Sequence, residues 1–371
     1  MTIRNGKGPQ GEAHSSAGIH LAMIDLIELD NLIMHDNYHY DRGQAIHIQP
    51  SDNGTAYLRN LLVYDNKGGY GGAINISGGV NNYIINCTIL NNQDKSVSIE
   101  YNAQVYVLNS IMDAQMSALN VNASSTSKFF VGYSFYQPGT QIIYGGDVFT
   151  SSNSNRVVFN DIFSSPKPSY VDSVNGNFAL ANWSEGIAKG TDTWVINGKT
   201  LTSPTTDLLG NQRPNPNGSS PDIGAYENSS SEIVYNPNKY VSVNGDNGSL
   251  GIITDPWRDI QYALDLANSG DIIHIGAGQY DENIVLTQEN LTILGESRET
   301  SIINGNQNGT VVTIPTGRNG ATVKNLTIKN NDLVIKNGNR IRNSTCSPIS
   351  NFRVLHFLIP DLFFLFFSAC A

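Results

Sequence analysis

One motif recurs along the first third of the chain and restricts the fold more than any other feature. It consists of an asparagine, an apolar or small residue, any residue, an apolar residue, two more residues and a second asparagine. Its copies begin at Asn31, Asn60, Asn86 and Asn109, and they close at Asn37, Asn66, Asn92 and Gln115. The leading asparagines are 29, 26 and 23 residues apart. Repeats of this length indicate a solenoid in which each copy belongs to one turn.

A second pattern, a short stretch of alternating apolar and polar residues, lies between the copies. It covers residues 45–48, 73–76, 96–99 and 118–121, with an earlier copy at 17–21. Two short strands in fixed order per repeat predict a parallel β-helix, with equivalent residues stacked about 4.7–4.9 Å apart. A leucine-rich repeat needs more leucine than these units contain, and an antiparallel sandwich does not predict the fixed order.

Alternation along these strands predicts which side chains lie inside. Two interior columns are expected, formed by Ile46, Ile74, Val97 and Leu119 and by Ile48, Ile76, Ile99 and Val121. The residues between them are expected to point outward, namely His20, His47, Asn75, Ser98 and Asn120. We expect the leading asparagines at a corner between sheets, because asparagine tolerates left-handed backbone and its amide can bond the equivalent asparagine one turn away.

Composition agrees with a β-rich fold and excludes several classes of partner. The chain has 45 asparagines against 22 Lys plus Arg, and only 15% of its 371 residues are charged. Asparagine and glycine are poor helix formers. The net charge of −10 argues against a nucleic-acid partner. Three cysteines make no disulfide framework, residues 1–6 show no signal-peptide core, and no apolar run is long enough for a transmembrane helix.

These repeats resemble the right-handed parallel β-helix, or pectin-lyase-like, superfamily over about residues 1–150 and again over 238–331. The resemblance implies an all-β, right-handed parallel β-helix, with a short capping helix that opens a second module. It implies fold more strongly than chemistry, because one fold hosts many functions. Residues 1–5 look like the middle of a turn, so we expect a first module without its N-terminal cap and an isolated chain that aggregates.

The first module is predicted to span residues 1–227 and to finish with a closing segment at about 207–227. That segment contains Asp-x-x-Gly-x-x-Arg followed by Asp-Ile-Gly-Ala-Tyr-Glu, and it resembles the choice-of-anchor Q domain of bacterial surface proteins. In such proteins the segment ends the helix. We expect Arg213 to pair with Asp222 or Glu227, and Tyr226 to cover the last turn.

Residues 228–234 form a polar linker, and a second module is predicted over 235–338. Its capping helix is expected at 256–268, with Thr254 or Asp255 as the N-cap and Pro256 in the first turn. The apolar stripe of that helix would comprise Ile260, Ala263, Leu264 and Ala267. The asparagine motif restarts at Asn290 and Asn325, which predicts about two turns.

Residues 339–371 lose the pattern and end in a phenylalanine-rich stretch. We interpret them as an aberrant, frameshifted or otherwise foreign tail. A membrane anchor is the alternative, but His356, Pro360 and Asp361 interrupt a stretch that is already short.

The densest group of titratable residues lies between two predicted strands. It comprises His35, Asp36, His39, Asp41, Arg42 and His47. Carboxylates and imidazoles together suit acid–base chemistry on sugars, although a polar surface loop is the more ordinary interpretation. A metal site would use His20 and His47 with Asp36 or Asp41, without supporting ligand spacing. The resemblance also implies Ca²⁺, but the outward positions are mostly Asn, Ser and Thr. No cofactor is therefore predicted, with Ca²⁺ as the alternative.

Three tyrosines precede their leading asparagines by the same three residues: Tyr57, Tyr83 and Tyr106. On successive turns they would stack. Rings that face outward offer a platform for glycans, whereas rings that point inward or lie at a corner only pack, which is the favoured interpretation. The function predicted overall is a secreted or cell-surface, non-catalytic protein that binds glycans. A polysaccharide lyase or glycoside hydrolase and a structural adhesin stalk are the alternatives.

Overall fold

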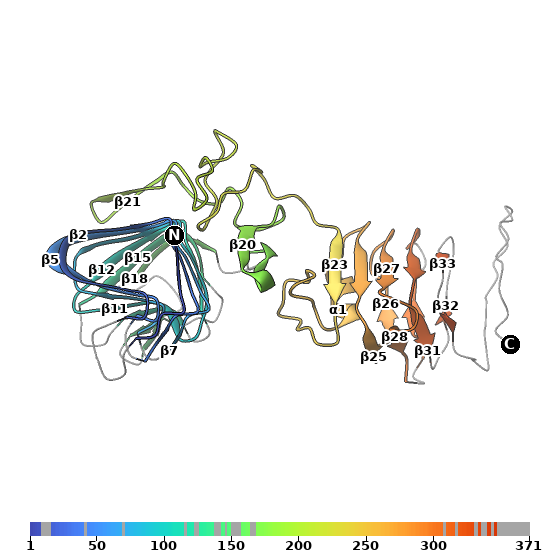
Figure 1. Cartoon of the computed structure of the whole chain (residues 1–371). Helices are drawn as coiled ribbons and strands as arrows, with labels where there is room; N and C mark the ends of the chain where they lie inside the picture. Colours follow the sequence, from blue (N-terminus) through green and yellow to red (C-terminus); the bar gives the residue numbers. More distant parts are fainter. Residues whose placement is uncertain are drawn as a thin grey trace. The chain divides into compact units, whose positions relative to one another are not determined.

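The structure is a computed structural model of the 371-residue chain. It describes residues 1–8, 16–40, 43–68, 71–114, 117–121, 126–136, 142–144, 147–149, 157–163, 168–306, 309–315, 318–329, 333–334, 340–342 and 345–346. The chain divides into two compact units, Met1–Val234 and Tyr235–Ala371 (Figure 1). Each unit is an all-β parallel solenoid, and α1 (Ile260–Leu266) is the one α-helix among the described residues.

Unit 1 is built around one 16-stranded sheet that wraps through the turns. Its strands are β1 (Thr2–Arg4), β2 (Ile19–Asp30), β3 (Ile33–His35), β5 (Ile46–Arg59), β6 (Leu62–Tyr64), β8 (Ile74–Ser77), β9 (Asn81–Ile85), β10 (Thr88–Asn92), β11 (Lys95–Glu100), β12 (Gln104–Leu108), β13 (Ile111–Ala114), β14 (Ser117–Val121), β15 (Lys128–Tyr136), β16 (Ile142–Tyr144), β17 (Asp147–Phe149) and β18 (Val157–Phe163). A small parallel pair accompanies it, β4 (Tyr38–His39) with β7 (Lys67–Gly68).

The remaining elements of unit 1 lie outside this sheet. They are the antiparallel pairs β19 (Tyr170–Asp172) with β20 (Asn177–Leu180) and β21 (Thr193–Ile196) with β22 (Lys199–Thr202), and a single 3₁₀ turn at Ser173–Asn175.

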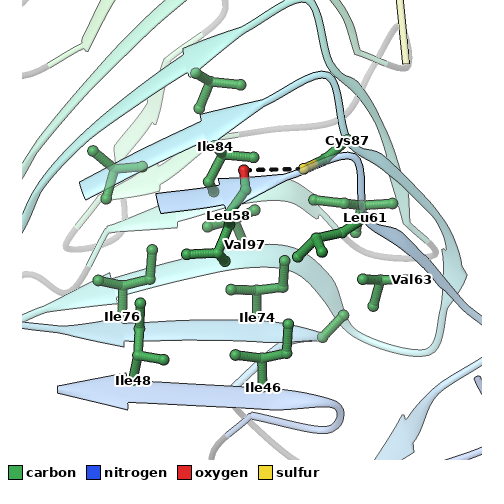
Figure 2. Packing of buried hydrophobic residues seen from close by; sticks show 14 of the residues in the cluster. Ile46, Ile48, Leu58, Leu61, Val63, Ile74, Ile76, Ile84, Cys87 and Val97 are labelled. Carbon is green, nitrogen blue, oxygen red and sulfur yellow. Dashed lines mark hydrogen bonds between the residues drawn. The ribbon is translucent and has the colours of Figure 1, made fainter. Parts of the chain in front are cut away.

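The predicted interior columns are confirmed by the strand register. Ile46 pairs with Ile74, Ile74 with Val97, and Val97 with Leu119. Ile46, Ile74 and Val97 are completely buried, as are Ile48 and Ile76 in the second column (Figure 2). Each such side chain contributes roughly 1.5–3 kcal/mol through removal of apolar area from water. Stacked columns of β-branched residues are therefore the main source of stability in unit 1.

The leading asparagines occupy a corner in left-handed backbone, as predicted. Their φ angles are 55° at Asn31, 52° at Asn60, 52° at Asn86 and 48° at Asn109. Asn60 Nδ2 donates to Asn31 Oδ1 at 3.1 Å, and Asn109 Nδ2 lies 3.4 Å from Asn86 Oδ1. Tyr133 and Asp161, both with φ of 48°, continue the same backbone feature in β15 and β18. The solenoid thus includes β15 and β18, where asparagine no longer marks the corner.

The closing asparagines form a second ladder inside the solenoid. Asn37 Nδ2 donates to Asn66 Oδ1 at 2.9 Å, and Asn66 Nδ2 donates to Asn92 Oδ1 at 3.0 Å. The backbone N–H groups of Asn37 and Asn66 donate to the same two oxygens. All three side chains are fully buried. Each amide therefore satisfies the main chain at a turn that no sheet hydrogen bond reaches.

Unit 2 is a smaller solenoid with three parallel sheets (Figure 1). The first contains β23 (Asn238–Val241), β24 (Ile272–Ile275), β27 (Thr292–Gly295), β30 (Thr322–Lys324) and β33 (Arg340–Arg342). The second contains β25 (Gly278–Tyr280), β28 (Ser301–Asn304), β31 (Thr327–Lys329) and β34 (Thr345–Cys346). The third contains β26 (Ile284–Val285), β29 (Val312–Thr313) and β32 (Leu333–Val334).

Two expectations about unit 2 need correction. Asn290 and Asn325 both have left-handed backbone, but Asn290 precedes the first sheet and Asn325 the second. They mark two different corners rather than the same corner of successive turns. The strands also continue past residue 338, because Ile341 pairs with Val323 and Cys346 pairs with Ile328. Part of the predicted aberrant tail is therefore solenoid, and residues 347–371 lie outside the described residues.

Helix α1 is shorter than the predicted 256–268 and is capped differently. Its apolar stripe is buried as expected, with Ile260, Ala263 and Leu264 at 0% exposure. Trp257, however, is extended and exchanges backbone hydrogen bonds with the chain next to β23, so the helix cannot start there. The backbone N–H groups of Ile260 and Gln261 donate instead to the two carboxylate oxygens of Glu282, both at 2.9 Å.

The 207–227 segment packs along the side of unit 1 rather than across its last turn. Leu208, Ile223 and Tyr226 join outward residues of three strands, Leu62, Leu90 and Ile111, in one buried cluster. Gly224, with φ of 103°, allows the close approach, since a Cβ there would lie 2.7 Å from Thr88 Oγ1. The corner asparagines hold this region in place: Asn60 donates to Thr206 O, Asn86 to Asp222 O and Asn109 to Thr191 O.

None of the helices in the described part of the chain is long and apolar enough to cross a membrane.

Candidate functional site

The predicted catalytic cluster is divided among separate parts of unit 1. His35 lies at the end of β3, where its ring stacks on Tyr64 with centroids 4.8 Å apart. Its Nδ1 lies 2.7 Å from Asp36 Oδ2, and the Asp36 side chain is 54% exposed. His47 lies on β5, in a different column of strands. Asp41 and Arg42 lie outside the described residues.

Two of the four described candidates are inaccessible. His39 and His47 both have 0% exposure. A Cβ at Gly8 would lie 1.8 Å from His39 Cδ2, so the chain at Gly8 lies directly on this imidazole. His47 stacks on His20 at 4.8 Å, and its Nε2 lies 3.3 Å from Ser77 Oγ. A polymeric substrate cannot reach either buried ring in this conformation.

The predicted outward column has the expected register but not the expected exposure. His20 pairs with His47, His47 with Asn75, and Asn75 with Ser98. Only His20 is exposed, whereas the other three are at most 2% exposed. At His47 the cause is local, because Gly43 folds back until its Cβ position is 2.8 Å from His47 Cβ. Pleat alternation correctly gave the direction of these side chains but not what covers them.

The tyrosine ladder exists, but chain segments cover most of it. Tyr57 stacks on Tyr83 at 5.0 Å, Tyr83 on Tyr106 at 5.5 Å, and Tyr106 on Phe130 at 4.8 Å. Tyr83 is 8% exposed and Tyr106 is fully buried. The burial of these two rings therefore supports a packing role.

The hairpin β21–β22 and one arginine close this ladder. Trp194 and Leu201 of the hairpin share a buried cluster with the ladder, and Gly132 makes room for the indole, since its Cβ would lie 2.9 Å from that ring. Arg59 Cζ lies 5.0 Å from the Tyr57 ring centroid. Glu28 and Asp30 hold the guanidinium there at 2.6–2.8 Å. Within the described residues, neither end of the ladder has an uncovered ring face on which a sugar could stack.

The charged residues of the 207–227 segment form a buried structural network. Arg213 Nε donates to Glu227 Oε2 at 2.9 Å, and both side chains are fully buried. Arg213 also donates to Asn60 Oδ1. Asp222 accepts the backbone N–H groups of Ala188 and Asn228. Burial, followed by the charge of Glu227, raises the pKa of Asp222 to about 7. Every one of these groups holds chain segments together, and none lines an open site.

Unit 2 presents a different kind of surface on its first sheet. Val241, Ile273, Ile275, Ile293 and Val323 point into its core. The alternate residues therefore point outward. We call them the open face: Asn238, Tyr240, Ile272, His274, Thr292, Leu294, Thr322 and Lys324. All eight are partly exposed, in contrast to His47, Asn75 and Ser98 of unit 1, which are buried. Figure 1 shows β23, β27 and β33 of this sheet in succession from yellow to red.

An aromatic pair and its polar neighbours form the centre of the open face. Tyr240 and His274 stack with centroids 4.5 Å apart and an interplanar angle of 11°. His274 Nε2 lies 2.8 Å from Asn238 Oδ1. Burial, followed by the charge of Lys324, lowers the pKa of His274. The imidazole is therefore neutral near pH 7 and serves as a hydrogen-bonding and stacking group. Hydroxyls of Thr292 and Thr322 occupy the adjacent column.

The asparagine motif does not mark this face, because its outward residues follow one another from strand to strand without a common residue type. Aligning Tyr240, His274, Leu294 and Lys324 would have shown the column.

Unit 2 also has a shallow depression on its surface. It is lined by Glu296, Ser297, Arg298, Glu299 and Asn325. Within the described residues, no group of three His, Cys, Asp or Glu side chains gathers to hold a metal ion.

Comparisons with known proteins give no match. No protein-family model matches it, and no curated protein or solved structure is significantly similar to it. The argument for function therefore rests on the surfaces described above.

Proposed function

We propose that this protein is a non-catalytic, extracellular or cell-surface β-solenoid that binds glycans through the open face of unit 2. The observation that carries the proposal is the contrast in coverage between the two units. Tyr83 and Tyr106 of the unit 1 ladder are packed under its own chain, whereas the stacked rings of Tyr240 and His274 remain partly exposed. Rings, amides and hydroxyls in one plane are the groups that bind sugars in many weak contacts.

The placement of the predicted acid–base residues favours binding over catalysis. His39 and His47 are buried, and His35 at the end of β3 lies in a different column of strands from His47 on β5. A lyase or glycosidase requires an acid and a base that converge on one glycosidic bond. A purely structural stalk remains the third hypothesis, and it predicts no binding at all.

A glycan array combined with a turnover assay, with and without Ca²⁺, tests the proposal. We expect retention on at least one polysaccharide without turnover. The Tyr240→Ala variant should weaken retention about tenfold, because it removes one ring of the stacked pair. Tyr262→Ala is the matched control, since Tyr262 is a partly exposed tyrosine of the same unit that lies on α1.

Three results would contradict the proposal. Turnover that is lost in His35→Ala or Asp41→Ala would establish the lyase or glycosidase hypothesis. Absence of retention on every glycan would leave the structural stalk. Retention that Tyr240→Ala and Tyr262→Ala weaken equally would remove the open face as the binding surface.

A further inference from the structure

The dipeptide of asparagine followed by glycine occurs repeatedly in this chain and is chemically reactive. The backbone nitrogen of the glycine can attack the side-chain amide carbon of the asparagine, because a glycine has no Cβ to hinder the approach. Eleven such dipeptides begin at Asn5, Asn53, Asn175, Asn197, Asn217, Asn244, Asn247, Asn304, Asn308, Asn319 and Asn337. Nine of them lie in the described part of the chain. Their surroundings decide which of them can react.

Burial and hydrogen bonding protect most of the nine. Five of the attacking N–H groups already donate to an acceptor, those of Gly6, Gly176, Gly245, Gly248 and Gly305. At Asn53 the following Gly54 is buried, and a Cβ there would lie 2.9 Å from Ile24 O. Among the nine described dipeptides, both residues are exposed at three, which begin at Asn197, Asn217 and Asn319.

Two of these three exposed dipeptides are held in place by neighbouring groups. Asn197 Nδ2 donates to Tyr106 Oη at 2.9 Å, and Asn197 has left-handed backbone with φ of 50°. Asn319 O accepts the backbone N–H of Asn290 at 2.8 Å. A Cβ at Gly320 would lie 2.2 Å from Asn290 Oδ1, so Asn290 packs directly on this peptide link. Attack at either position requires that these contacts first open.

The dipeptide at Asn217 lacks such restraints. Asn217 and Gly218 are the central residues of a β-turn that Ser219 closes by donating its N–H to Pro216 O at 3.1 Å. A Cβ at Gly218 would meet no atom within 4 Å. Within the described residues, neither the Asn217 side chain nor the Gly218 N–H has a hydrogen-bond partner. Both reacting groups can therefore turn toward each other without breaking a contact.

We propose that Asn217 is a site of spontaneous deamidation in the folded protein, with water as the only co-reactant. Gly218 N forms a bond to Asn217 Cγ and loses its proton to solvent, and the side-chain nitrogen takes up a proton and leaves as ammonia. Water then opens the resulting succinimide at either of its two carbonyl carbons, which yields aspartate or isoaspartate. Nothing is oxidised or reduced. This reaction does not depend on glycan binding.

The chain around Asn217 can accept this change without loss of the fold. Its two ends are held by other contacts, since Arg213 N donates to Thr205 O and Gly190 N donates to Pro221 O. Residues 214–221 carry no charged side chain. Deamidation therefore replaces a neutral amide by a carboxylate at the surface as the protein ages, and we expect thermal unfolding to stay unchanged.

Incubation of the full chain at physiological temperature and mildly alkaline pH, followed by peptide mapping with mass spectrometry, measures the rate at each dipeptide. We expect Asn217 to convert about tenfold faster than Asn197, because the contacts of Asn197 must open first. Isoaspartate should accompany aspartate, since only the cyclic intermediate yields it. Asn217→Gln should remove the product, because the longer side chain closes a larger ring more slowly. Asn197→Gln is the matched control and should leave conversion of Asn217 unchanged.

Unfolding in urea separates the effect of structure from that of sequence. We expect Asn217 and Asn197 to convert at similar rates in urea, because both are then unrestrained and followed by glycine. Equal rates in the folded chain would overturn the proposal. Aspartate without isoaspartate would also overturn it, since direct hydrolysis needs no attack by Gly218. A difference in rate that persists in urea would assign the selectivity to neighbouring residues and would likewise overturn it.

Discussion

At the scale of single residues, asparagine performs two different tasks in this solenoid. The leading asparagines adopt left-handed backbone at a corner, and the side-chain amides of Asn86 and Asn109 donate to carbonyl groups of the 191–224 region. The closing asparagines are buried and bond to one another and to backbone N–H groups. Asparagine suits both positions because it tolerates positive φ and carries a donor and an acceptor on a short side chain.

Removal of one buried amide should be costly. Asn66→Ala deletes the acceptor for Asn37 Nδ2 and for the Asn37 backbone N–H, and it also deletes the donor to Asn92. We expect a loss of about 2–4 kcal/mol in the free energy of unfolding, because buried partners are left unsatisfied. Chemical denaturation measures it. Asn53→Ala, at an exposed position of β5, is the control, and an equal loss there would refute the ladder as a source of stability.

The stability of unit 1 should depend on pH through Asp222. Its pKa is raised to about 7 in the folded chain, above the usual value of about 4, so the folded state binds the proton more tightly than the unfolded state. The resulting stabilisation is complete below about pH 4 and disappears as the pH rises through 7. Thermal unfolding should therefore shift to lower temperature between pH 5 and 8. Asp222→Asn should flatten that slope, and an unchanged slope would contradict the assignment.

At the scale of elements, the N-terminus of the short helix in unit 2 is capped by Glu282, a residue outside the helix. Helix α1 has Asp259 at its N-cap, but that side chain makes no capping hydrogen bond. Glu282 supplies the two acceptors from more than twenty residues further along the chain. The carboxylate also lies at the positive end of the helix, which favours its charge. Local sequence therefore identified a helix but not its cap.

Loss of this contact should loosen α1 selectively. Glu282→Ala leaves the backbone N–H groups of Ile260 and Gln261 without acceptors. A lost cap costs about 1 kcal/mol, which corresponds to roughly fivefold faster hydrogen exchange of the α1 amides. Mass spectrometry of peptic peptides measures this rate. Glu299→Ala, whose side chain is 72% exposed, should have no effect, and equal acceleration in both variants would exclude a capping role.

At the scale of the whole molecule, unit 1 carries a long strand edge that no described strand covers. β2 is 12 residues long and pairs with β5 on one side. Met23 and Leu26 in this strand are 74% and 56% exposed. Unpaired edges with apolar residues are templates for association between chains.

We therefore expect the purified chain to self-associate as its concentration rises. Leu26→Lys should reduce association, because a charge on an edge strand opposes pairing with another edge. Sedimentation velocity measures the shift toward monomer. Val174→Lys changes a valine that is 75% exposed but lies in the 3₁₀ turn rather than on a solenoid edge. A monomeric unmodified chain, or equal dispersal by both substitutions, would contradict the prediction.

The sequence by itself determined the class of fold and the register of the first turns. Period-two alternation and recurring asparagines identified the Ile46–Ile74–Val97 column, because in a solenoid each repeat pairs with its neighbour in sequence. The same rule failed where the marker residue changed, as at Tyr133 and Asp161, which adopt the corner conformation without being asparagine. It also failed at Ile341, which pairs with Val323 although the asparagine motif is absent there.

Tertiary structure alone decided which outward side chains are accessible. Alternation predicts that His47, Tyr83 and Tyr106 point away from the core. The cover over the two tyrosines comes from the β21–β22 hairpin, which belongs to no repeat. The same applies to Arg213, whose partner Asn60 lies 153 residues away. Contacts between repeat and non-repeat segments have no period in the sequence. The candidate site therefore lies at Tyr240 and His274, which are stacked and partly exposed, rather than at the buried rings of the tyrosine ladder.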